Sequence, residues 1–264
     1  MNEDLAGRVR THDPDRYLTA LLAPADARDG LLTLYAFAHE LARACAVTSE
    51  PHLALIRLHW WREVVDGAPR RHDIATPLTA LIREGRLSAA DLSPVIDAWE
   101  MEAHAPGILA AVESLDAWRA WLMAGEGGVA VAAARLLGSS DPETARASGA
   151  VCGAARVLRG NRAAATRGQC WLPEDVTRDN GVTIDEAIAA PDGLAVAAAL
   201  SRLAEEALSW MEGSVRRIPR AWRAAMLPAV LARRDLRRIA RGAAAVSARD
   251  RGFGDRFAVI WRGI

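Results

Sequence analysis

The sequence predicts an all-α fold in a single domain, and three observations support this prediction. Apolar residues recur at three- and four-residue spacing along most of the chain. No segment shows the strict alternation of apolar and polar residues that a half-buried strand requires. The connections between the expected helices are short, which is typical of antiparallel bundles. With 264 residues, 51% of them hydrophobic and 25% charged, the chain can bury one large core.

The helices follow from periodicity and from their start and stop signals. One helix spans residues 25–47, where an apolar stripe runs from Leu31 to Cys45. The next begins at Pro51, a residue favoured in the first helical turn, and ends near Gly67. The other predicted helices span 74–84, 88–104, 114–138, 141–160, 192–216, 220–242 and 255–262. Residues 160–182 are expected to form the one long irregular stretch.

The composition excludes several classes of protein. Lysine is absent and arginine supplies all 33 basic residues, but 33 acids balance them, so nothing in the net charge points to nucleic acid. No stretch of about 18 apolar residues predicts a membrane span. An acidic N-terminus argues against a secretory signal, and Cys45, Cys152 and Cys170 lack paired or metal-binding spacing. We therefore expect a cytoplasmic protein, with a peripheral position at the inner membrane left open.

Two blocks of sequence resemble the squalene/phytoene synthase family. The first runs from Leu34-Tyr35-Ala36-Phe37 to Arg57-Leu58-His59-Trp60-Trp61-Arg62. The second joins Arg156-Val157-Leu158-Arg159 to Gly168-Gln169-Cys170-Trp171-Leu172-Pro173, and Ala124-Gly125-Glu126-Gly127-Gly128 is a secondary match. The resemblance covers residues 13–262 of the single domain 1–264. It implies an isoprenoid synthase fold, in which a helical bundle surrounds a central cavity.

The resemblance also implies a chemistry: the head-to-head condensation of two prenyl diphosphates. Magnesium bridges the diphosphate oxygens, and two aspartate-rich helical motifs hold the metal. The resemblance places the aspartates of the first motif at Ala42, Arg43 and Ala46, and those of the second at Gly160 and Ala164. None of these five residues is an acid. We therefore expect no catalytic residue, no metal site and no cofactor at these positions.

We expect a non-catalytic assembly or lipid-binding factor, most of all one that assembles respiratory complex I, and an active prenyltransferase is the alternative. One branch of the family, which includes an assembly factor of mitochondrial respiratory complex I, resembles this chain and implies a non-catalytic assembly role with a respiratory complex subunit as partner. A second reading is an active prenyltransferase, a phytoene or squalene synthase that binds magnesium through Glu40, Asp97 or Glu100. The third is a lipid-binding protein whose cavity holds an isoprenoid or quinone-like tail. For the acids Asp97, Glu100 and Glu102 of one helix, a solvated face is the simpler interpretation.

The arginines supply the candidate binding residues. Arg43, Arg159, Arg162 and Arg167 could grip a phosphate without metal, and Trp171 would lie near the cavity mouth if it does not simply pack the loop. The stretch 213–242 is strongly basic with apolar residues between its arginines. It predicts either a basic outer face of the bundle or docking on an anionic membrane through Arg233, Arg234, Arg237 and Arg238.

Overall fold

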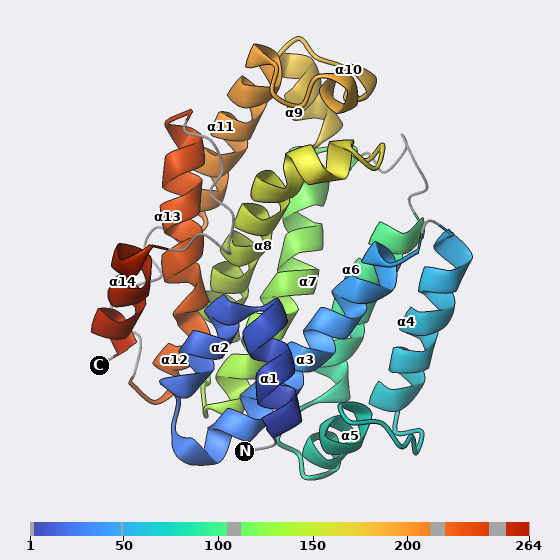
Figure 1. The fold of residues 1–264 in the computed structure, drawn as a ribbon, viewed down its shortest axis with the longest axis vertical. Helices are drawn as coiled ribbons and strands as arrows, with labels where there is room; N and C mark the ends of the chain where they lie inside the picture. Colours follow the sequence, from blue (N-terminus) through green and yellow to red (C-terminus); the bar gives the residue numbers. More distant parts are fainter. Residues whose placement is uncertain (1–2, 49, 105–111, 212–219, 243–251, 264) are drawn as a thin grey trace.

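The computed structural model describes residues 3–48, 50–104, 112–211, 220–242 and 252–263 (Figure 1). In these ranges all regular structure is helical. The elements are α1 Glu3–His12, α2 Pro14–Leu21, α3 Ala25–Ala46, α4 Pro51–Val65, α5 Ala75–Arg83, α6 Ala89–His104, α7 Leu115–Leu136, α8 Pro142–Ala165, α9 Glu174–Asp179, α10 Ile184–Ala189, α11 Leu194–Ser209, η2 Arg220–Trp222, α12 Arg223–Met226, α13 Pro228–Ala240 and α14 Phe253–Gly263. The predicted all-α class is confirmed.

Helices α7 and α8 form the centre of the bundle, and their backbones nearly touch (Figure 1). Gly149 of α8 makes this approach possible: a Cβ there would lie 2.2 Å from the carbonyl oxygen of Glu126 in α7. Gly127 of α7 is similarly constrained, since its Cβ would lie 2.9 Å from the carbonyl oxygen of Arg146. The glycines around Glu126 therefore serve close helix packing and fix Glu126 in the middle of the molecule.

Two large apolar clusters flank this central pair. One joins α1 and α3–α7, with Phe37 and Leu58 fully buried; the other joins α7, α8, α11 and α13 around Trp118 and Leu203. Helix α3 is buried on nearly every side from Gly30 to Ala38. The predicted single apolar stripe in α3 was too narrow because α1, α4, α5, α6 and α7 all pack on this helix.

Several predicted elements need correction. Helix α8 continues to Ala165, and α9 occupies part of the stretch that was expected to be irregular. The short helix α10 was not predicted either. The predicted helix 220–242 is broken into η2, α12 and α13, because Pro228 lacks the N–H that a continuous helix needs and instead begins α13. Helices α1 and α2 were not predicted. Part of the predicted helix 192–216 lies outside the described residues.

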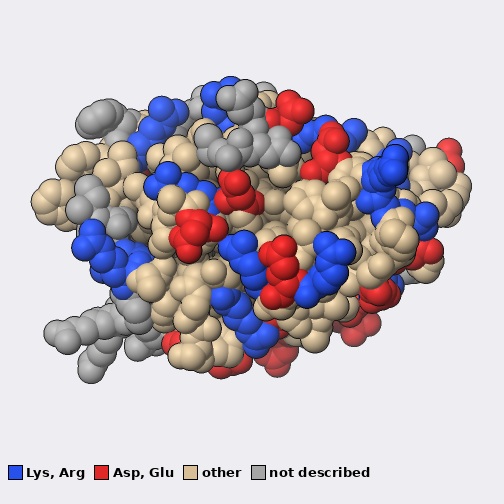
Figure 2. Space-filling model, turned by 90° about the horizontal axis from the view of Figure 1, so that it is seen from below, with Lys and Arg blue, Asp and Glu red and all other residues tan. Residues whose placement is uncertain are grey.

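The surface carries both signs of charge. Figure 2 shows arginine and acidic side chains interspersed over one face, in keeping with the balanced composition. In the described part of the chain, no helix combines the length and the apolar character that crossing a bilayer requires.

Candidate functional site

A cavity of about 660 Å³ opens where α3, α6 and α8 end and α4 begins. Its volume falls within the usual range for sites that bind small molecules. The lining is chemically mixed. Ala42, Ala46 and Trp99 contribute apolar surface. Glu102, Arg156, Arg167 and Gln169 contribute polar groups, and we refer to these four residues as the polar wall.

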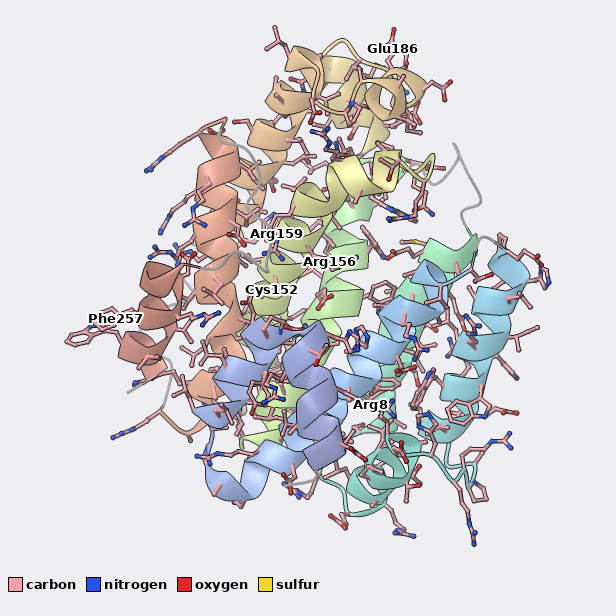
Figure 3. The ribbon with its side chains drawn as sticks, viewed as in Figure 1. Arg8, Cys152, Arg156, Arg159, Glu186 and Phe257 are labelled. Carbon is pink, nitrogen blue, oxygen red and sulfur yellow. The ribbon has the colours of Figure 1, made fainter. Side chains whose placement is uncertain are left out.

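Two residues of the polar wall belong to an alternating series of four side chains from four helices, which we call the arginine–glutamate chain. It runs from Arg16 in α2 through Glu126 in α7 and Arg156 in α8 to Glu102 in α6. Arg16 donates a hydrogen bond to Glu126. The Nε atom of Arg156 lies 3.4 Å from Oε1 of Glu126, and its Nη2 lies 3.6 Å from Oε2 of Glu102. Figure 3 shows Arg156 in the interior of the bundle.

The pKa values of the two glutamates of this chain shift in opposite directions. Burial alone would raise the pKa of Glu126, but Arg16 and Arg156 outweigh it and lower that pKa below its ordinary value. Burial raises the pKa of Glu102, and Arg156 offsets this only in part. Glu126 is therefore an ionised partner of two arginines, whereas Glu102 is the acid that most readily accepts a proton at the cavity wall.

The guanidinium of Arg156 is also held by aromatic rings. It lies 4.8 Å from the ring centroid of Trp99 and 5.9 Å from that of Trp121. Contacts of this kind stabilise a partly desolvated cation. The Nε atom of Arg156 and Oε2 of Glu102 are buried without a hydrogen bond, although they remain within ion-pair range of their partners. These two atoms are therefore held by charged partners inside the protein and are not exposed to the cavity.

The first predicted motif reaches this cavity only in part. Ala42 and Ala46 line it, but Arg43 does not: its Nη1 lies 3.1 Å from Oε1 of Glu40, and both residues line other pockets. Neither residue of the second motif is among the cavity lining. A Cβ on Gly160 would point into open space, and Ala164 is only 3% exposed in the apolar core.

The other candidate anion-binding residues are dispersed. Arg167 lines the cavity. Arg159 instead donates a hydrogen bond to the buried Asp235 at 2.7 Å, and the exposed Arg162 lies 2.9 Å from Asp192. Trp171 is buried and stacks on Trp121 with 5.7 Å between ring centroids. Of the five candidates, Arg167 is thus the one that the structure brings to the cavity.

The proposed substitute metal ligands also have other partners. Arg62 of α4 binds Asp97 at 2.6 Å and Glu100 at 2.8 Å, and neither acid lines the cavity. The interpretation of these acids as a solvated face was wrong for Glu102, which turns into the cavity wall and is largely buried.

Magnesium prefers several oxygen ligands, chiefly carboxylates and water. In the described ranges no group of three or more histidine, cysteine or acidic residues could hold a metal ion. The acid of the cavity wall, Glu102, faces Arg156, and Arg167 lies on the same wall. Two cations beside one carboxylate repel a divalent cation, so the residues present do not fit magnesium.

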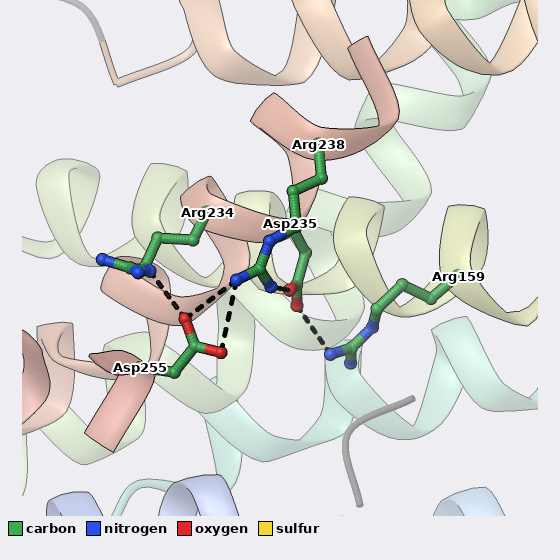
Figure 4. Close-up of polar contacts among 5 residues, drawn as sticks. All are labelled: Arg159, Arg234, Asp235, Arg238 and Asp255. Atoms are coloured by element: carbon green, nitrogen blue, oxygen red, sulfur yellow. Dashed lines mark hydrogen bonds and ion pairs between the residues drawn. The ribbon is translucent and has the colours of Figure 1, made fainter. Parts of the chain in front are cut away.

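The predicted membrane-docking arginines do not form one free basic face. Figure 4 shows that Arg234 and Arg238 of α13 both bind Asp255 of α14, at 2.7 and 3.2 Å. Arg238 also donates to Asp235 of its own helix. Arg233 is half-buried, and Arg237 is exposed. At least two of the four arginines thus hold the molecule together.

The fold matches solved structures of isoprenoid-synthase type. A squalene synthase from Alicyclobacillus acidocaldarius superposes with a TM-score of 0.75 at 15% identity, over 90% of this chain and 92% of that one. A dehydrosqualene synthase gives a TM-score of 0.78 at 13% identity, over 99% and 94% of the two chains. The model of the squalene/phytoene synthase family matches residues 9–257. The chain therefore belongs to the squalene/phytoene synthase family.

The relatives among curated proteins are named as complex I assembly factors and not as synthases. Complex I assembly factor 6 of Bos taurus is 32% identical over 93 residues, which are 34% of this chain and 28% of that protein. The Mus musculus factor is 25% identical over 185 residues, 67% of this chain and 54% of that one. The chain thus spans about a quarter to a half of the length of these relatives.

Proposed function

We propose that this protein is a non-catalytic member of its family that holds a lipid tail in its cavity and helps to assemble respiratory complex I at the inner membrane. The observation that carries the non-catalytic part is the arginine–glutamate chain. A synthase of this family would need carboxylates free to hold magnesium. In this protein Glu126 is held between Arg16 and Arg156, and Glu102 lies beside Arg156.

The shape and chemistry of the cavity support lipid binding. Its apolar lining residues, which include Ala42, Ala46 and Trp99, suit an isoprenoid or quinone-like tail. Arg156 and Arg167, whose guanidinium groups only donate hydrogen bonds, suit a head group with oxygen atoms. The assembly role is supported by the relatives, which are named as complex I assembly factors.

Lipid binding is tested by extracting the purified protein and identifying co-purified lipids by mass spectrometry. We expect one isoprenoid-type species in the wild type. The variant Ala42→Phe fills the cavity and should lose the lipid, whereas Ala163→Phe, an exposed site on α8, should retain it. Equal lipid content in the two variants would contradict the assignment of this cavity.

The assembly role is tested in cells. Deletion of the gene should lower complex I activity and leave carotenoid or hopanoid levels unchanged. Restoration by the wild-type gene provides the control. Loss of the isoprenoid product with normal complex I activity would instead favour the alternative, a prenyltransferase that condenses prenyl diphosphates head to head.

A further inference from the structure

Helix α14 presents an apolar face to solvent. Phe257, Ile260 and Trp261 are 52%, 38% and 73% exposed and follow one another at helical spacing, so they form one ridge. The rings of Phe257 and Trp261 stack with 6.0 Å between centroids. Figure 3 shows Phe257 projecting away from the molecule at its outer edge. We refer to these three residues as the aromatic ridge.

The opposite face of α14 fixes this orientation. Val259 is fully buried and packs with Leu227 and Leu231. Asp255 is 3% exposed and accepts hydrogen bonds from Arg234 and Arg238 of α13 (Figure 4). These contacts determine which side of the helix turns inward, and the aromatic ridge consequently turns outward.

The charge around the ridge is positive. The segments 220–242 and 252–263 contain nine arginines and two aspartates. Both aspartates, Asp235 and Asp255, are buried and bound to arginines. Arg237 on α13, Arg241 directly after α13 and Arg256 on α14 are exposed. In Figure 2 the edge at which α14 lies, on the left, shows mostly arginine and uncharged side chains among its described residues.

We propose that α14 docks on an anionic lipid membrane through the aromatic ridge, with exposed arginines contacting the lipid head groups. An exposed Trp and Phe beside basic residues are typical of helices that lie in the membrane interface. The positive surroundings favour an anionic bilayer over a neutral one. The arginines that bind Asp255 serve to hold α14 in place. This docking surface is separate from the cavity, and membrane docking through it does not depend on the assembly role.

Co-sedimentation with vesicles tests the proposal. The wild type should bind phosphatidylcholine vesicles that contain phosphatidylglycerol and bind weakly to vesicles of phosphatidylcholine alone. Phe257→Ala with Trp261→Ala should weaken binding at least about tenfold. Leu194→Ala is the matched control, because Leu194 is 91% exposed on α11, away from the ridge. This control should bind as the wild type does.

A second pair of variants tests the charge. Arg237→Glu with Arg256→Glu should weaken binding to anionic vesicles by at least about fivefold per cation. Arg83→Glu, an exposed site on α5, should not change it. Circular dichroism and the melting temperature verify that each variant is folded. Unchanged vesicle binding in the ridge variant would overturn the proposal. The proposal would also be overturned if the wild type formed a dimer that did not bind vesicles and the ridge variant were a monomer. The ridge would then contact a second copy of the chain.

Discussion

Replacing Glu126 with glutamine removes the carboxylate that lies between Arg16 and Arg156. The side chains of Glu126 and Arg16 are only 12% and 14% exposed, so water cannot take over the solvation of the remaining charge. Removal of one member of a buried ion pair typically costs about 3–5 kcal/mol. We expect Glu126→Gln to lower the free energy of unfolding by an amount in this range, because Arg16 and Arg156 would also repel each other. A domain has about 5–15 kcal/mol of stability in total.

Urea denaturation followed by far-ultraviolet circular dichroism measures this loss. The matched control is Glu40→Gln, since Glu40 pairs with the more exposed Arg43 and such pairs contribute about 0–1 kcal/mol. A double variant with Arg16→Met and Glu126→Gln should lose less than the sum of the two single variants. If Glu126→Gln stays within about 0.5 kcal/mol of the wild type, the interpretation of the arginine–glutamate chain is refuted.

Three further predictions follow from packing and protonation. Gly149→Ala should destabilise the protein by at least about 2 kcal/mol because its Cβ would meet the backbone of α7, whereas Gly160→Ala should gain about 0.5–1 kcal/mol; thermal unfolding compares the two. Burial raises the pKa of Glu102 above its ordinary value of 4.5, so the stability that this residue contributes is present below that pH and lost as the pH rises through the higher folded-state pKa. Glu102→Gln should therefore be more stable relative to the wild type at about pH 8 than at about pH 5, as measured by urea unfolding, and a constant difference would contradict this. Burial raises the pKa of Cys45 and Cys152 to about 12, so both should react slowly with a thiol reagent in the native state and rapidly after unfolding; equal rates would contradict the raised pKa.

The sequence predicted most helices because periodicity, proline and glycine act locally. It did not predict α9 or α10, whose few turns are too short for a periodic pattern, although Thr183 and Glu186 form a capping box at the start of α10. Pro228 marks the break before α13, although the periodicity of the residues around it favours one continuous helix.

The site was harder to predict because its members come from distant parts of the chain. Arg16 and Glu126 are 110 residues apart in sequence, and no local pattern joins them. The glycines around Glu126 indicate a close contact between two helices, and they could have marked Glu126 as a buried acid. Arg43 was expected at the cavity, but its position on α3 turns it towards Glu40.

We propose above all that this protein does not catalyse prenyl transfer. The most direct test incubates the purified protein with farnesyl or geranylgeranyl diphosphate and magnesium and measures pyrophosphate release. An active synthase of the same family assayed in parallel provides the positive control. We predict no release above the protein-free background, whereas steady turnover that rises with protein concentration would contradict the account.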